Sequence, residues 1–140
     1  MHVKLCDFGW STHTIDERRM TFCGTVDYVA PELIYQEPYD EKIDIWAVGI
    51  LSYELLTGQA PFTGQNEKDT YSNITNLDLQ STEIYQALSP DARDFVSKIL
   101  ITVPSKRMNL QDMLKHPWLR ESSIFGEFWN TYKEDWIMSV

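Results

Sequence analysis

Apolar side chains are concentrated between residues 43 and 56, and they cover nearly every side of the helix that this stretch would form. The run follows Asp40 and Glu41, either of which suits the start of a helix, and it ends at Thr57 before Gly58. The apolar positions are Ile43, Ile45, Trp46, Val48, Ile50, Leu51, Leu55 and Leu56. A helix that is apolar all round belongs in the interior of a domain, so the pattern predicts a central helix.

Four shorter segments carry the signals of further helices. Pro31 suits the first residue of a short helix that reaches Tyr35, and Ser89 followed by Pro90 forms a cap and a first helical residue. After Pro90, apolar residues recur at helical spacing as far as Leu100. The predicted helices besides the central one cover residues 31–35, 67–74, 89–100 and 110–114.

The two ends of the chain differ from this helical middle. Val3–Cys6 is expected to form a short strand, and residues 10–30, rich in Thr, Ser, Arg and Asp without a sustained period, an irregular loop. In the tail, residues 120–140, aromatic side chains recur every three or four positions: Phe125, Phe128, Trp129, Tyr132 and Trp136. This spacing predicts an amphipathic helix. We therefore expect a mainly α fold, with one domain over residues 1–119 and a separate tail.

The chain is acidic and has few cysteines. Its formal charge of −9 and pI near 4.7 disfavour nucleic acid or an anionic membrane as the main partner, since both would repel it, and suit basic peptides. The longest apolar stretch contains Asp44 and Glu54 and is too short and too polar to span a bilayer. Cys6 and Cys23 match no metal-ligand pattern, so reduced thiols in an intracellular protein are expected.

Two short motifs stand in order near the start of the chain, Asp7-Phe8-Gly9 and Ala30-Pro31-Glu32. The first matches a magnesium-binding motif of phosphoryl-transfer enzymes, and the second marks the end of their activation segment. Asp7 would hold Mg²⁺ across the phosphates of ATP, because the metal neutralises charge as it moves onto the leaving oxygens. Either motif alone is weak evidence, but the two in this order indicate phosphoryl transfer.

A basic stretch precedes Thr21, between the two motifs. Arg18 and Arg19 lie three and two positions before it, which resembles the substrate preference of kinases that select basic sites. A phosphate on Thr21 would add about two negative charges and order the loop through arginine contacts. A solvated basic loop without modification is the alternative.

From Val3 to Leu119 the sequence resembles the C-terminal lobe of a serine/threonine protein kinase, and within that superfamily the Aurora family. Ala30 departs from this pattern, because Aurora members often carry proline there. The segments that carry the resemblance are Asp7-Phe8-Gly9-Trp10-Ser11, residues 18–28 (RRMTFCGTVDY), residues 40–46 (DEKIDIW) and His116-Pro117-Trp118.

The resemblance implies roles for residues on the substrate side. Gly24 and Thr25 would form a shelf for the substrate backbone, and Thr25 would also hydrogen-bond the catalytic base. Glu54 would bind a substrate arginine, although a surface acid at a helix end is the alternative. Thr21 would be the activating phosphorylation site.

The resemblance also implies structural roles for three charged residues. Glu32 would be a buried acid, and Arg107 stands where the kinase pattern places its partner, the alternative for Arg107 being an ordinary surface arginine. Asp44 lies on an apolar helix, so its carboxylate needs hydrogen-bond partners. In the family it accepts hydrogen bonds from backbone N–H groups of the catalytic loop.

Several parts of a complete kinase domain have no counterpart in this sequence. No Gly-rich phosphate loop, Val-Ala-Ile-Lys strand or His-Arg-Asp catalytic loop precedes Asp7. The fold class is therefore a kinase C-lobe that begins at Asp-Phe-Gly, without the N-lobe and catalytic loop. The chain alone is expected to be inactive and to bind Mg²⁺ and ATP weakly or not at all, because positioning supplies nearly all catalysis of phosphoryl transfer. If four or five apolar side chains of the central helix stay in contact with water, the chain loses roughly 1.5–3 kcal/mol of stabilising free energy for each. Marginal stability is therefore expected.

Two functions stay open on this basis. The chain is either the C-lobe of an Aurora-like kinase that phosphorylates serine or threonine near arginines, or a kinase-derived binding or scaffold module without catalysis. The expected partners are proteins with basic motifs and the missing N-lobe or another kinase-associated protein, but not nucleic acid or membrane. The resemblance places such kinases in the cytoplasm, the nucleus, the spindle or the centrosome.

Overall fold

The computed structural model describes residues 4, 6, 8, 25–77 and 79–120 of the chain. In this part every regular element is a helix, apart from an isolated β-bridge at Tyr39. None of these helices is long and apolar enough to cross a membrane. In chain order the elements are the 3-10 helix η2 (Val26–Tyr28), α1 (Pro31–Ile34), α2 (Lys42–Thr57), α3 (Glu67–Asn76), α4 (Glu83–Ala87), α5 (Pro90–Ile99), the 3-10 helix η3 (Pro104–Lys106), α6 (Leu110–Lys115) and α7 (Pro117–Arg120).

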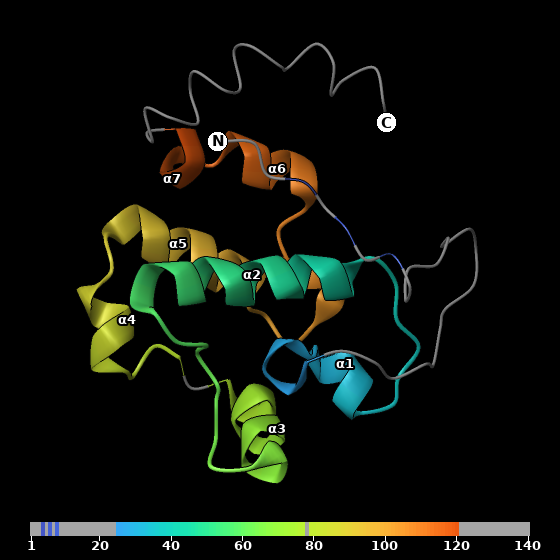
Figure 1. The fold of residues 1–140 in the computed structure, drawn as a ribbon. Helices are drawn as coiled ribbons and strands as arrows, with labels where there is room; N and C mark the ends of the chain where they lie inside the picture. The colour runs from blue at the N-terminus through green and yellow to red at the C-terminus, as the bar shows by residue number, and fades with distance from the viewer. Residues whose placement is uncertain (1–3, 5, 7, 9–24, 78, 121–140) are drawn as a thin grey trace.

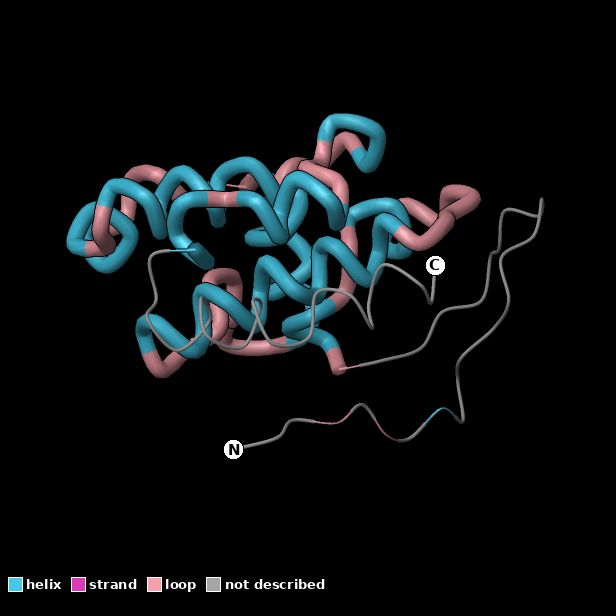
Figure 2. The backbone as a smooth tube through the Cα atoms, turned by 90° about the horizontal axis from the view of Figure 1, so that it is seen from above, coloured by secondary structure: helices cyan, strands magenta, loops and turns pink. Residues whose placement is uncertain are grey.

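The long helix α2 lies at the centre of these elements (Figure 1). It packs along α5 and contacts both η2 and η3. On one side of this pair lie α6 and α7, with α7 against α5, and on the other side lie α1 and α3 (Figure 1). Figure 2, which looks down on the same chain, shows only helices and the loops that join them in the described part. The mainly α fold predicted from the sequence is confirmed.

The predicted helices are found at nearly the expected positions. Helix α2 ends before Gly58, whose positive φ of 82° favours glycine, and α5 begins with the Ser89 side chain accepting the N–H of Ala92. Helices α4 and α7 escaped prediction because segments of five and four residues are too short to show a period. The strand expected at Val3–Cys6 falls mainly outside the described residues, and its two described members, Lys4 and Cys6, are in no strand. The predicted tail helix lies wholly outside them.

The core forms where α2 meets α5. Gly49 allows the two helices to approach closely, because a Cβ atom there would come within 2.6 Å of Ile99 Cγ2 and 2.7 Å of Leu100 Cδ2. Beside this contact Trp46 is fully buried and stacks on Phe62, with ring centroids 5.9 Å apart. The main cluster of buried residues contains Ala30, Trp46, Ile50, Tyr53, Phe62, Ile74, Leu79, Tyr85, Val96 and Leu100.

The opposite side of α2 is exposed, which agrees with the expectation that some apolar side chains of the central helix stay in contact with water in this chain. Val48, Leu51 and Leu55 keep 39%, 45% and 78% of their surface exposed in the described structure. They follow one another at intervals of three and four residues, so they lie on one face of the helix. Helix α2 is therefore central, as predicted, with its inner face buried and this second face exposed within the described structure.

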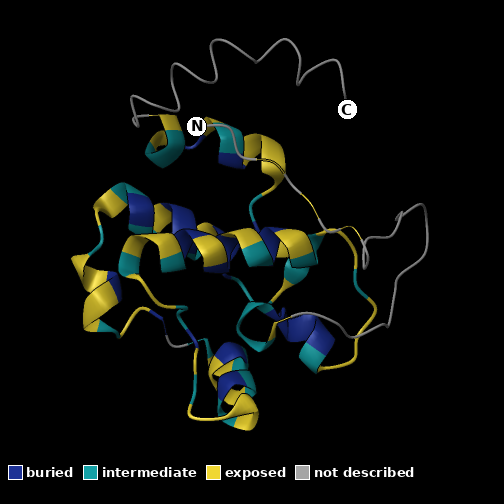
Figure 3. Cartoon of the chain, viewed as in Figure 1, coloured by how far each residue is buried: buried dark blue, intermediate teal, exposed yellow. Residues whose placement is uncertain are grey.

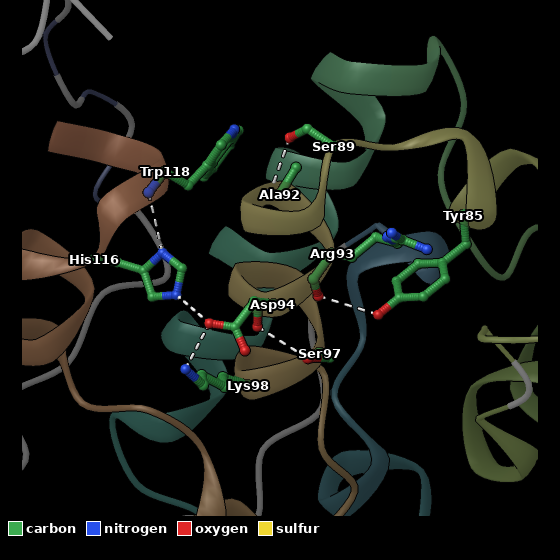
Figure 4. A network of polar contacts seen from close by, with 9 residues as sticks. All are labelled: Tyr85, Ser89, Ala92, Arg93, Asp94, Ser97, Lys98, His116 and Trp118. Carbon is green, nitrogen blue, oxygen red and sulfur yellow. Dashed lines mark hydrogen bonds and ion pairs between the residues drawn. The ribbon is translucent and has the colours of Figure 1, made fainter. Parts of the chain in front are cut away.

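A second apolar cluster holds α6 and α7 onto α5. Phe95 of α5 packs against the Trp118 ring, with centroids 4.7 Å apart, and Ile45 of α2 belongs to the same cluster. Next to it, the buried His116 ring contacts Asp94, with Nε2 and Oδ2 2.9 Å apart, while its Nδ1 accepts the Trp118 N–H (Figure 4). Because Nδ1 is an acceptor, Nε2 carries the proton and donates it to Asp94.

The charge of Asp94 is stabilised by its neighbours. Lys98 donates to Oδ2 of Asp94 over 2.6 Å, and this hydrogen bond is the main cause that lowers the pKa of the carboxyl. The bond from His116 lowers the pKa further, whereas the loss of hydration acts in the opposite direction. The carboxylate therefore stays charged while it ties the residue before α7 to α5.

An ion pair inside the fold joins residues that lie 75 positions apart. Arg107 donates to both carboxylate oxygens of Glu32, over 2.7 Å from Nη1 and 2.6 Å from Nη2, and the two side chains are 0% and 2% exposed. The other N–H groups of Arg107 donate to the carbonyls of Lys42, Ile101 and Thr102. The guanidinium also lies over the Trp46 ring, 5.1 Å from its centroid. A bidentate pair with every donor used offsets much of the cost of burying both charges.

Replacing Arg107 by alanine should strongly destabilise the chain. The change would leave the Glu32 carboxylate buried without a partner, which costs about 3–5 kcal/mol. Urea unfolding of the 140-residue chain, followed by circular dichroism, measures the loss.

Lys106→Ala is the matched control, because the neighbouring side chain is exposed and should change stability by less than about 0.5 kcal/mol. The double variant Glu32→Gln/Arg107→Met should lose less than Arg107→Ala, since no charge stays buried. Equal losses for Arg107→Ala and Lys106→Ala would contradict this account.

Candidate functional site

Residues 25–30 form a short shelf that lies against the core of α2. The carbonyl of Thr25 accepts the Tyr28 N–H over 3.0 Å, and η2 follows directly from this turn. Ala30 then caps α1, with Pro31 as the first helical residue. Because η2 contacts both α2 and α3, the shelf is held between two helices that come later in the chain.

Glu54 of α2 is bound to this shelf through Tyr28. The Tyr28 hydroxyl donates a hydrogen bond to Oε2 of Glu54, 26 positions further along the chain. This bond, with burial and the Glu54 charge as smaller causes, raises the pKa of Tyr28 to about 12. Within the described residues the second carboxylate oxygen, Oε1, accepts no hydrogen bond. Glu54 is thus a partly buried carboxylate with a defined orientation and one oxygen available.

A second acid lies on the same shelf. Asp27 accepts a hydrogen bond of 2.7 Å from the hydroxyl of Thr63, which follows α2. The charge of Asp27 also contributes to the raised pKa of Tyr28, so it acts on the same phenol as Glu54. Two carboxylates around one tyrosine make this edge of the shelf negative, and such an edge attracts a cationic side chain.

A cavity of about 170 Å³ opens beneath the shelf, lined by Thr25, Tyr28, Ile43 and Asp44 among others. The Asp44 side chain is exposed and makes no hydrogen bond within the described part of the chain. Loss of hydration from neighbouring protein atoms raises the pKa of Asp44, and the charge of Glu41 raises it further. The cavity therefore combines apolar walls with one carboxylate that can still accept hydrogen bonds.

The structure brings together only some of the residues singled out in the sequence. Thr25 and Asp44 line one cavity, Glu54 lies beside the shelf, and Glu32 pairs with Arg107. Asp7, Thr21 and Gly24 lie outside the described residues.

Sequence reasoning missed Tyr28, Asp27 and Thr63. Asp27 and Tyr28 lie within residues 18–28, one of the segments that carry the kinase resemblance, and this position was the available signal. Thr63 has no signal of its own, because only the fold brings it to Asp27.

Comparison with known proteins matches residues 1–119 to the protein kinase domain. The chain is 47% identical over 121 residues to Aurora kinase C of Mus musculus, covering 86% of this chain and 43% of that protein. It is 40% identical over 121 residues to Aurora kinase of Dictyostelium discoideum, covering 85% of this chain and 30% of the relative.

Aurora kinase of Schizosaccharomyces pombe is 40% identical over 135 residues, 96% of this chain and 34% of the relative. The chain thus spans less than half the length of each of these relatives. It belongs to the protein kinase family, within which it is similar to the C-terminal lobe of the Aurora kinases.

Proposed function

We propose that this chain forms the substrate-binding half of an Aurora-like serine/threonine kinase, which moves phosphate from ATP to hydroxyls near arginines. The observation that carries the proposal is Glu54, whose carboxylate is oriented by Tyr28 at the edge of the shelf. A guanidinium can form short, charge-assisted hydrogen bonds with such a carboxylate. Asp27, on the same edge, adds negative charge where a basic peptide would pass.

Asp7 is the residue of this chain that would hold Mg²⁺. A single carboxylate suits this ion, because Mg²⁺ binds in nucleotide sites through one or two carboxylates together with the substrate phosphates. When bound, the metal would neutralise charge on the transferring phosphoryl group. ATP itself would need further residues of a complete kinase domain.

The residues around the shelf would then position the peptide. Gly24 has no side chain, so a peptide backbone can approach closely there. Thr25 lines the cavity and would hydrogen-bond the catalytic base of a complete domain. Phosphorylation of Thr21 would order the segment through the neighbouring arginines. We infer an intracellular protein, at the spindle, the centrosome or the nucleus, by family resemblance.

The cavity at Asp44 and the exposed face of α2 would receive the other half of the domain. The free acceptor oxygens of Asp44 fit backbone N–H groups from a catalytic loop. Val48, Leu51 and Leu55 would lose their exposure against a preceding helix, which favours assembly by burial of apolar surface. A kinase N-lobe, or another kinase-associated protein, is therefore the partner that these features suit.

A non-catalytic binding module is the second candidate. It is favoured by one observation, that the acidic edge formed by Glu54 and Asp27 suits a basic peptide whether or not phosphate is transferred. Such a module would bind basic peptides without modifying them.

The purified 140-residue chain should transfer no phosphate by itself. With Mg²⁺, radiolabelled ATP and a peptide carrying two arginines before its serine, we expect incorporation at the level of a blank without protein. The reason is that phosphoryl transfer depends on positioning groups that this sequence does not contain. Turnover that persists through purification and is lost in Asp7→Asn would overturn this expectation.

The chain should nevertheless bind that peptide through Glu54. Replacing Glu54 by glutamine should weaken binding at least about tenfold, since a hydrogen bond to a charged group contributes about 1.5–3 kcal/mol. Isothermal titration or NMR titration of the full chain with the peptide measures the change.

Glu83→Gln is the matched control, because it removes an equal charge from an exposed position on α4. A peptide in which lysines or alanines replace the arginines provides the second control, and it should show little dependence on Glu54. Equal losses of affinity for Glu54→Gln and Glu83→Gln would mean that only net charge matters and that Glu54 is not the arginine site.

A further inference from the structure

A cavity of about 400 Å³ opens between the loop after α2, the last turn of α3 and the residue before α4. Its volume falls within the range of ligand pockets in proteins, roughly 300–1,000 Å³. Figure 3 shows both buried and exposed residues on α3, so this helix is held by the fold and still faces solvent. The described residues that line the cavity are Pro61, Phe62, Asn73, Asn76 and Thr82.

A strained residue fixes the end of α3 next to this cavity. Leu77 follows Asn76 with a φ of 48° and a ψ of 42°, a left-handed conformation that leucine rarely adopts. Its N–H donates to the carbonyl of Asn73, and its side chain packs against the main buried cluster. Such a conformation persists only where its surroundings hold it, so the backbone that carries the two asparagines is fixed.

The two asparagines supply hydrogen-bond acceptors. Asn73 donates from Nδ2 to the carbonyl of Phe62 over 3.1 Å, while its Oδ1 accepts no hydrogen bond within the described residues. Asn76 donates to Oγ of Ser72 over 3.4 Å, and its Oδ1 likewise has no donor in the described part of the chain. The C-terminal end of α3 adds a partial negative charge. The cavity therefore suits a ligand that donates hydrogen bonds.

The other lining residues are apolar or already hydrogen-bonded. Pro61 and Phe62 contribute rings to the cavity wall. Thr82 uses its hydroxyl twice, because it donates to the carbonyl of Leu79 and accepts the N–H of Tyr85. No ionisable side chain is among the described lining residues, so a charged ligand would meet no counter-ion there. The cavity thus favours an uncharged ligand with an apolar ring and a hydrogen-bond donor.

We propose that this cavity binds a tryptophan side chain of a partner protein. The indole ring packs on Pro61 and Phe62, and its N–H donates to an asparagine Oδ1. An aliphatic side chain would leave these acceptors without a donor, and a guanidinium would lose hydration without meeting a carboxylate. Tryptophan is also enriched among the residues that contribute most to binding at protein interfaces. The cavity shares no described residue with the shelf, so this proposal does not rest on the proposed kinase function.

Titration of the isotope-labelled 140-residue chain with N-acetyl-tryptophanamide, followed by NMR, tests the site. The side-chain amide signals of Asn73 and Asn76 should shift and saturate, with a dissociation constant of about 1 mM or less. The indole N-methyl derivative of this probe keeps the ring but lacks the N–H. It should bind at least about fivefold more weakly, which is the loss expected for one hydrogen bond.

Two variants test the same contact from the protein side. Asn76→Ala removes one acceptor and should weaken binding of N-acetyl-tryptophanamide at least about fivefold. Gln65→Ala is the matched control, because it removes an exposed carboxamide from the loop before α3 that does not line the cavity, and it should leave the affinity unchanged. Both side chains are exposed, so neither change should prevent folding.

Four results would overturn the proposal. Absence of a saturable shift at Asn73 and Asn76 up to about 10 mM probe would show that the cavity accepts no indole. Equal affinity for the N-methyl derivative or for N-acetyl-leucinamide would show that the N–H is not recognised. Tighter binding of N-acetyl-argininamide would identify a cation site instead. Equal affinities of Asn76→Ala and Gln65→Ala would show that the probe binds elsewhere.

Discussion

Arg107 uses all five of its N–H donors on acceptors from three segments of the chain: Glu32 in α1, Lys42 at the start of α2, and Ile101 and Thr102 after α5. The guanidinium is fully buried, so each of these bonds replaces a bond to water that the group has lost. This one side chain thereby links α1 to the start of α2. Because residues 25–30 lead directly into α1, the orientation of the candidate substrate shelf depends on it as well.

The candidate functional surface is built from partly exposed acids, whereas the Glu32–Arg107 ion pair is buried. Glu54 and Asp27 lie at the rim of the fold, where a carboxylate can meet a cation from solvent. Tyr28 restrains Glu54 without neutralising it, because a phenol with a pKa of about 12 donates a hydrogen bond and remains uncharged. The buried pair thus supplies rigidity, and the partly exposed acids are the groups that would recognise a basic peptide under the proposed function.

The apolar side of α2 connects stability to assembly. Trp46, Gly49 and Ile50 bury the inner face of the helix against its neighbours, which is enough to place α2 at the centre. Val48, Leu51 and Leu55 add to stability only when another segment covers them. The stability of the chain therefore depends on which segment or partner covers this face of α2.

Local features of the sequence determined the helices and where they end. Ser89 and Pro90 start α5, Gly58 ends α2, and in each case the deciding interaction spans four residues or fewer, which a linear pattern contains. The two motifs and their order likewise indicated the family before any geometry. Helix α4 could not be predicted in this way. It has one buried side chain, Tyr85, and a single buried position cannot show the apolar repeat of a helix.

The tertiary structure decided most of the contacts between distant residues. The resemblance named Arg107 as the partner of Glu32, and the structure confirms that pair, but the other three bonds of Arg107 depend on the packing of α2 and the loop after α5. The bond from Tyr28 to Glu54 and the exposure of Leu55 were also beyond a linear pattern. When a helix is apolar on all sides, its sequence does not show which side is buried. Packing against the neighbouring helices determines that side.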